Sequence, residues 1–120
     1  MKGLNMNKLL IALIVIGQIL GMASSSFSAE NAKPVILDVR TEAEWQSGHL
    51  EGAVLIPYDQ IGKKIGTVVK DKSQRIYLYC RTGRRSKIAK EALDKLGYKD
   101  VINLETLEKA SVALKLKIVK

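Results

Sequence analysis

Apolar residues gather in short blocks along most of the chain, and the composition of these blocks predicts strands. Val35–Val39 is largely apolar and rich in β-branched residues, which is typical of a strand buried on both faces. The tail Leu114–Ile118 alternates apolar residues with lysine, as an edge strand does. We expect three further strands from similar runs, at Ala53–Ile56, Arg75–Tyr79 and Asp100–Asn103.

Helical patterns lie between these strands. Thr41 and Glu44 have the spacing of a capping box, which places a helix start at this point. After the third strand, apolar residues recur at helical spacing, and Ser86 is a suitable N-cap for that helix. We expect helices at Glu42–Ser47, Tyr58–Ile65, Ser86–Leu96 and Thr106–Leu114. Strands that alternate with helices indicate an α/β fold, here a single small domain with a mainly parallel central sheet flanked by helices.

The first segment of the chain has a different character. Two lysines flank a polar start, Leu9–Ala23 is almost wholly apolar, and small residues follow. This arrangement predicts a secretory signal peptide over residues 1–28, with the domain at 29–120. An uncleaved anchor is the alternative, but a membrane-spanning helix needs about 20 apolar residues and this run is shorter. We therefore expect a periplasmic or secreted protein, without a stable membrane anchor once the signal is cleaved.

The net positive charge of the chain limits the classes of binding partner that we expect. Removal of residues 1–28 takes away two lysines and no acidic residue, so the net charge falls from +8 to +6. A basic surface can attract nucleic acid, but the lysines are scattered with few aromatic residues between them. We expect no nucleic-acid partner and a surface that favours small anions.

The chain has one cysteine, which cannot form an internal disulfide, and an odd cysteine in an exported chain is either intermolecular or reactive. Cys80 stands where a strand ends and a helix is about to begin, the place where α/β sheets bind ligands. Gly83 permits a loop whose N–H groups surround an anion, and nearby arginines add positive charge. Each feature favours a thiolate and lowers the pKa of Cys80. We expect the substrate to contact Arg81, Thr82, Gly83, Arg84, Arg85 and Ser86.

His49 is the only histidine, so a Cys80–His49 catalytic pair is conceivable from residue types alone. The alternative is that His49 forms local hydrogen bonds and orders the turn before the second strand. We prefer this second role because the loop already stabilises the thiolate. One cysteine and one histidine do not make a zinc site, and we expect neither a metal nor a cofactor.

Four sequence segments, in this order and spacing, resemble those of the rhodanese-homology domain. They are Asp38-Val39-Arg40, Glu44-Trp45, Gly48–Ala53 leading into Ile56-Pro57, and Cys80-x-x-Gly83-x-Arg85-Ser86. The resemblance covers about Val35 to Asn103. With the predicted signal peptide and the small size, the chain is similar to the exported phage-shock-protein E type of thiosulfate sulfurtransferase.

The resemblance implies a covalent cycle. The Cys80 thiolate attacks the sulfane sulfur of thiosulfate, sulfite leaves, and cyanide or a thiol then removes the outer sulfur from the Cys80 persulfide. Arg85 matches the loop arginine of the family. Asp38 and Arg40 are expected to support the architecture of the strand ends rather than the chemistry.

Two alternatives stay open beside this function. Phosphatase relatives of the family have a longer Cys-x5-Arg loop, whereas the sixth residue after Cys80 is Ser86, so the loop is better sized for a sulfur substrate. Family members often carry a Gly-Gly pair after the asparagine of the fourth strand, but here Leu104, Glu105 and Thr106 follow Asn103. This departure motivates a sulfur carrier or binding module with little or no turnover.

Overall fold

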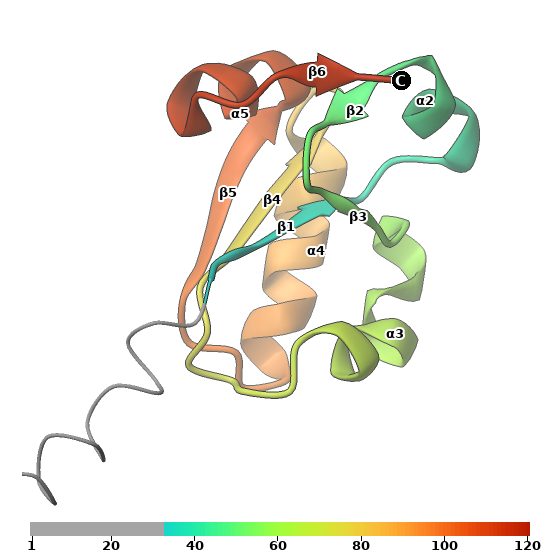
Figure 1. Cartoon of the computed structure of the whole chain (residues 1–120). Helices are drawn as coiled ribbons and strands as arrows, with labels where there is room; N and C mark the ends of the chain where they lie inside the picture. The colour runs from blue at the N-terminus through green and yellow to red at the C-terminus, as the bar shows by residue number, and fades with distance from the viewer. Residues whose placement is uncertain (1–32) are drawn as a thin grey trace, which may run out of the picture. The chain divides into compact units, whose positions relative to one another are not determined.

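A four-stranded sheet organises the domain. The computed structural model describes residues 33–120, and the predicted signal peptide lies outside them. The strands follow the order β3-β1-β4-β5 and pair in parallel, which confirms the predicted mainly parallel sheet (Figure 1). Their bounds are β1 (Val35–Asp38), β3 (Val54–Leu55), β4 (Ile76–Cys80) and β5 (Val101–Thr106).

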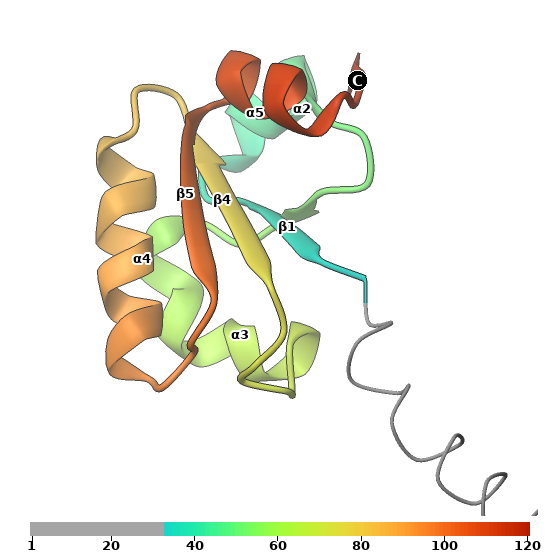
Figure 2. The ribbon, with the colours of Figure 1, turned by 90° about the vertical axis from the view of Figure 1, so that its left-hand side faces the viewer.

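Helices cover the sheet and its upper end. Two of them, α3 and α4, lie on one side of the sheet, while α5 lies across the end at which β4 and β5 finish (Figures 1 and 2). None of the helices in residues 33–120 has the length and apolar character that a membrane crossing requires. The helices are α2 (Glu42–Ser47), the 3₁₀ turn η1 (Tyr58–Gln60), α3 (Ile61–Val68), α4 (Arg84–Lys95) and α5 (Leu107–Leu114).

Alternation along β4 divides the core into two clusters. Leu78 and Cys80 point into the larger cluster, against residues of α3 and α4 such as Leu93. Tyr79 points to the opposite face and packs with Leu107 of α5. Because successive side chains of a strand face opposite sides, a cysteine at the end of β4 lies in the core beneath α4.

Several predicted boundaries were wrong in informative ways. The second strand is short and lies at the edge of the sheet, where Val54 is 38% exposed, so it is not buried on both faces. The predicted helix Tyr58–Ile65 begins as a 3₁₀ turn and continues to Val68, since Gly62 does not interrupt it.

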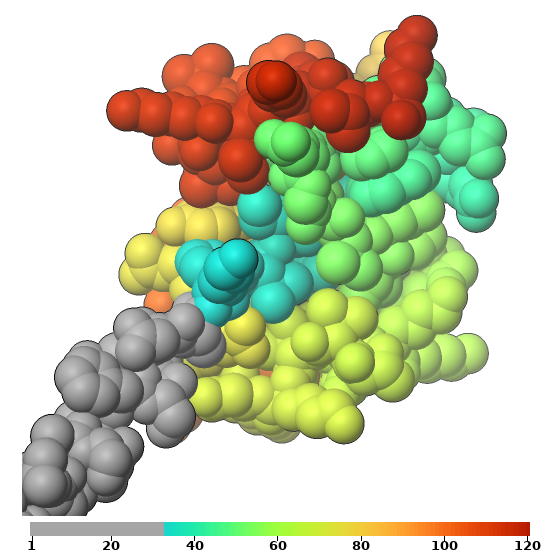
Figure 3. Space-filling view, in the orientation of Figure 1, coloured from blue at the N-terminus to red at the C-terminus, as the bar shows by residue number. Residues whose placement is uncertain are grey.

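The C-terminal tail forms less strand than predicted. Only β6 (Ile118–Val119) is extended, and it pairs antiparallel with β2 (His49–Leu50), a strand that the sequence pattern did not indicate. Figure 3 shows the C-terminal residues packed against the neighbourhood of β2 on this face. Strands of two residues are too short to show a periodic pattern in the sequence. The pairing of β2 with β6 could therefore not be predicted, because it depends on contacts between segments far apart in the chain.

The predicted capping box at the start of α2 is present in full. The Glu44 backbone N–H donates to Thr41 Oγ1 at 3.3 Å, and the Thr41 N–H donates to the Glu44 carboxylate at 3.0 Å. The cap therefore holds the Glu44 side chain at the carboxyl end of the sheet, close to the loop that follows β4.

We predict that Thr41→Ala lowers the free energy of unfolding by about 1 kcal/mol, because an N-cap hydroxyl satisfies a backbone N–H that has no partner within the helix. Urea denaturation measures this change. Thr67→Ala is a matched control, since the Thr67 hydroxyl only bonds the Lys64 carbonyl on the exposed side of α3, and it should shift stability by less than about 0.5 kcal/mol. Equal losses in the two variants would contradict a capping role.

Candidate active site

The candidate site lies where three parallel strands end. Cys80 is the last residue of β4, Asp38 is the last residue of β1, and Thr106 ends β5 directly opposite Cys80. The carboxyl ends of parallel strands are the usual ligand-binding edge of an α/β sheet. The fold thus places the predicted nucleophile at the edge where chemistry is expected.

Hydrogen bonds surround the sulfur of Cys80. The Gly83 N–H points at Sγ at 3.0 Å, and the Ser86 hydroxyl oxygen lies 3.5 Å from Sγ and 3.1 Å from the Gly83 carbonyl oxygen. Gly83 has a φ of +98°, a left-handed conformation that glycine adopts at little cost and that turns the loop back toward the sulfur. Cys80 is fully buried, with 0% exposure.

Ser86 is not the N-cap that its position predicted. α4 begins at Arg84, and Gly83 is the cap residue, with no side-chain cap bond. The left-handed turn at Gly83 starts the helix two residues earlier than expected. Ser86 therefore lies inside the first turn, where its buried hydroxyl faces Cys80 instead of solvent.

The pKa of Cys80 lies below its ordinary value, in the predicted direction. Burial raises this pKa, because it disfavours the charged thiolate. Hydrogen bonds from the Ser86 hydroxyl and from the backbone of Ser86, Gly83 and Thr82 outweigh burial and lower it. The main stabilisation of the thiolate thus comes from loop hydrogen bonds rather than from the arginine charges that the sequence emphasised.

The three loop arginines have different surroundings. Arg85 forms a two-pronged ion pair with Glu44, with N–O distances of 2.8 and 2.9 Å, and this bond lowers the pKa of Glu44 to about 2. The Arg85 guanidinium therefore anchors the loop to α2. Arg84, at the start of α4, and Arg81, after β4, are both exposed. Neither forms an ion pair with any residue from 33 to 120.

Asp38 and Arg40 form a buried ion pair behind the loop. Arg40 Nη2 lies 2.6 Å from Asp38 Oδ2 and also donates to the Gly48 carbonyl at 2.6 Å. Its guanidinium carbon lies 5.5 Å from the centre of the Tyr79 ring, whose hydroxyl accepts the Leu50 N–H at 2.9 Å. The pair thus ties the end of α2 and strand β2 to the central sheet.

His49 lies among these supporting residues. Its ring stacks on Trp45 with centroids 3.5 Å apart, and Nδ1 lies 2.9 Å from the Trp45 carbonyl oxygen. No hydrogen bond joins His49 to Cys80 within residues 33–120. This geometry is that of a residue which orders the turn after α2.

Glu105 lies within β5, at a position where the family resemblance led us to expect glycine. It has a φ of +75°, which is strained for a residue with a side chain. A Cβ atom added at Gly83 would lie 3.4 Å from the Glu105 Cβ, so the backbone does pass close to the active loop. Lys109 Nζ lies 2.6 Å from the Glu105 carboxylate and offsets its negative charge.

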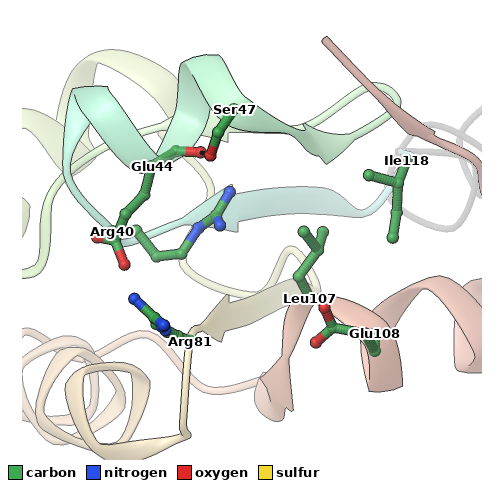
Figure 4. A pocket seen from close by; sticks show the side chains of 7 residues that line it. All are labelled: Arg40, Glu44, Ser47, Arg81, Leu107, Glu108 and Ile118. Atoms are coloured by element: carbon green, nitrogen blue, oxygen red, sulfur yellow. Dashed lines mark hydrogen bonds between the residues drawn. The ribbon is translucent and has the colours of Figure 1, made fainter.

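A pocket of about 450 Å³ opens beside the loop (Figure 4). Its walls come from the segment between β1 and α2, from α2, from the residue after β4, and from α5 and β6. The residues contributed by α5 and β6 were not singled out from the sequence, because only tertiary packing brings the tail to this edge. Among residues 33–120, no three His, Cys, Asp or Glu side chains are grouped as metal ligands would be. The walls include Arg40, Glu44, Arg81, Leu107, Glu108 and Ile118.

Known proteins are similar to this chain in sequence and in fold. Residues 25–106 match the family model of the Rhodanese-like domain. The chain is 40% identical over 67 residues to the thiosulfate sulfurtransferase PspE of Escherichia coli (strain K12), covering 56% of this chain and 64% of PspE. It is 38% identical over 69 residues to YrkF of Bacillus subtilis (strain 168), named as a candidate sulfur carrier protein, covering 58% of this chain and 36% of YrkF. A solved rhodanese from E. coli superposes with a TM-score of 0.67 at 34% identity, covering 73% of this chain and 99% of that one.

The structure of this chain is that of an α/β domain with a cysteine loop at the end of a parallel strand. The chain belongs to the rhodanese-like family, because the family model covers more than half of its residues. The chain spans less than two thirds of the length of PspE, and a smaller part of YrkF. The fold of the solved E. coli rhodanese confirms the predicted fold class.

We predict that Ser86→Ala raises the pH at which Cys80 becomes a thiolate, because the variant removes the hydroxyl that lowers the Cys80 pKa. Ultraviolet absorbance of the thiolate, followed through a pH titration, gives the midpoint. The wild-type midpoint should lie below that of free cysteine. Ser73→Ala, in an exposed turn, is the matched control and should leave the midpoint in place. An unchanged midpoint in Ser86→Ala would show that the hydroxyl does not stabilise the thiolate.

The buried ion pair allows a paired comparison of stability. The side chains of Asp38 and Arg40 are 0% and 7% exposed, whereas those of Asp100 and Arg75 are 38% and 47% exposed. Asp38→Ala leaves a buried guanidinium without its partner and should cost about 3–5 kcal/mol. Asp100→Ala should cost less than about 1 kcal/mol, because water screens an exposed pair. Urea unfolding of both variants measures the difference, and similar losses would refute a supporting role for Asp38.

Proposed function

We propose that this protein is a sulfurtransferase that moves sulfane sulfur from thiosulfate to cyanide or a thiol through a Cys80 persulfide. The observation that carries the proposal is the set of donors directed at Cys80 Sγ, which the Gly83 N–H approaches at 3.0 Å. A thiolate is the nucleophilic form of cysteine, and these donors favour it. Family membership supports the same reaction class, and PspE is named as a thiosulfate sulfurtransferase.

The first half-reaction loads the enzyme. The Cys80 thiolate attacks the outer sulfur of thiosulfate, a new S–S bond forms, and the S–S bond of thiosulfate breaks with its electron pair leaving on sulfite. Loop N–H groups that bind the thiolate are also placed to hold the charge of the persulfide. The E. coli structural relative is described as a rhodanese with anions, which fits an anion-binding loop.

In this reaction the loop residues have separate roles. Thr82, Gly83 and Ser86 supply the hydrogen bonds to sulfur. Arg85 positions the loop through Glu44, and Arg81 and Arg84 attract the anionic donor electrostatically. Asp38, Arg40 and His49 do not react; their ion pair and hydrogen bonds hold the segments next to the loop in place.

The reaction takes place outside the cytoplasm in this proposal. The three-part pattern of residues 1–28 supports export, so the domain would act in the periplasm or as a secreted protein. A persulfide cycle on a single cysteine suits that setting, because no second thiol is available for an internal disulfide.

We expect purified protein mixed with thiosulfate and cyanide to produce thiocyanate, and Cys80→Ser to reduce production to background, because the reaction needs the sulfur nucleophile. Colorimetric detection of thiocyanate gives the rate. Intact-mass measurement after thiosulfate alone should show one added sulfur on the wild type and none on Cys80→Ser. Thiocyanate formation that survives Cys80→Ser would remove Cys80 from the mechanism.

A sulfur carrier with little turnover is the second candidate. Two observations favour it: Cys80 has no exposed surface, and Glu105 packs over Gly83 of its loop. YrkF, the relative named as a candidate sulfur carrier, is 38% identical to this chain over 69 residues. A protein that gains one sulfur from thiosulfate but forms thiocyanate only slowly would be a carrier. A protein that gains none would be neither enzyme nor carrier.

A further inference from the structure

Two residues other than glycine have a positive φ within residues 33–120. Lys115, with a φ of +56°, is the C-cap of α5, and helices commonly end in this left-handed conformation. Glu105, with a φ of +75°, lies inside β5, where no helix end accounts for it. A strained backbone of this kind persists only where the surrounding structure holds it, and it is common at functional sites.

The strained residue lies in a β-bulge between β4 and β5. The register pairs Leu78 with Asn103. Two residues further along β4, Cys80 pairs with Thr106, which is three residues further along β5. β5 therefore holds one extra residue between these pairs, and such a bulge bends the strand and redirects a side chain. Figure 2 shows β4 and β5 side by side, so the bulge lies at the end of the sheet from which the cysteine loop leaves.

The side chain of Glu105 packs against Gly83 of the cysteine loop. A Cβ atom placed on Gly83 would lie 3.4 Å from Cβ, 3.6 Å from Cγ and 3.7 Å from Cα of Glu105, and these are its three nearest atoms outside the adjoining residues of the chain. Gly83 is also the residue whose N–H lies 3.0 Å from Cys80 Sγ. The loop residue that donates to the sulfur is therefore in contact with one residue of β5.

Glu105 is itself held by its neighbours. Its N–H donates to Asn103 Oδ1 at 2.8 Å, and Lys109 Nζ donates to its carboxylate at 2.6 Å. The next residue, Thr106, pairs with β4 and accepts the Lys109 N–H at 3.1 Å as the N-cap of α5. These bonds anchor Glu105 at the junction of β5 and α5.

We propose that Glu105 is a positioning residue for sulfur transfer, and that it acts through Gly83. Its Cβ and Cγ hold the loop in the conformation in which the Gly83 N–H stays directed at Cys80 Sγ. The carbon stem provides this support, whereas the carboxylate only forms the ion pair with Lys109. This inference rests on the proposed sulfurtransferase function, because it assigns a residue that prepares the nucleophile of that reaction.

Loss of this support has a sign that separates packing from charge. Without the stem of Glu105, the Gly83 N–H contacts the sulfur less often, and a thiolate that loses a donor forms only at higher pH. Cys80 stays buried in the variant, because the core cluster beneath α4 that contains Leu93 encloses it. Removal of a nearby negative charge has the opposite sign, because it favours the thiolate.

Three variants of the purified protein test the proposal by ultraviolet titration of the thiolate. Glu105→Gly removes the stem and should raise the titration midpoint by up to about one pH unit, the size expected for one weakened hydrogen bond. Glu105→Gln keeps the stem and removes the charge, so its midpoint should not rise above that of the wild type. Lys115→Gly removes the other side chain at positive φ, and should leave the midpoint in place.

Hydrogen exchange of the Gly83 amide reports on the same contact directly. Measured by NMR at one pH, exchange should be up to about tenfold faster in Glu105→Gly, and unchanged in Glu105→Gln and Lys115→Gly. Glu105→Ala keeps Cβ but lacks Cγ, and should give an intermediate rate. It replaces Glu105→Gly if urea unfolding shows that the glycine variant is poorly folded.

The rate at which thiosulfate adds sulfur to Cys80, followed by intact mass across the same pH range, should shift to higher pH in Glu105→Gly alone. If the wild type takes up no sulfur, the proposed function fails, while titration and exchange still test Glu105. If the midpoint of Glu105→Gly stays in place or falls, or if the glycine and glutamine variants change together, the positioning role is wrong while the sulfurtransferase proposal stands.

Discussion

A buried sulfur atom can carry a negative charge only if hydrogen-bond donors contact it. The conformation of the loop after β4 meets this requirement. Burial of Cys80 opposes ionisation, so the Gly83 N–H and the Ser86 hydroxyl must both reach Sγ. That geometry in turn requires the left-handed turn at Gly83 and an early start of α4. The remaining features of the site either hold this loop in place or shape the approach to it.

Two ion pairs support the loop from different directions. The buried Asp38–Arg40 pair joins the end of β1 to Gly48, and so fixes the segment that leads from α2 into β2. The Arg85–Glu44 pair joins α4 to α2, whose capping box holds the same Glu44 carboxylate. Arg85, which we predicted to contact the substrate, is thus paired with Glu44, whereas Arg81 lines the pocket.

The C-terminal segment supplies part of the wall of the pocket beside the loop. α5 and β6 bring a carboxylate and two apolar side chains to an edge that would otherwise be cationic. Glu105, strained at φ +75° beside Gly83, connects this segment to the loop, and its own charge is offset by Lys109.

The sequence by itself determined the alternating α/β order, the capping box at Thr41 and the position of Cys80 at a strand end, because periodicity, capping and turn preferences are local properties of the chain. It also indicated the direction of the Cys80 pKa shift. Tertiary structure alone decided that Ser86 faces the sulfur, that Arg85 is paired with Glu44, and that Glu108 and Ile118 line the pocket. Each of these depends on contacts between segments far apart in the chain, and such contacts leave no periodic trace in the sequence from which they could be inferred.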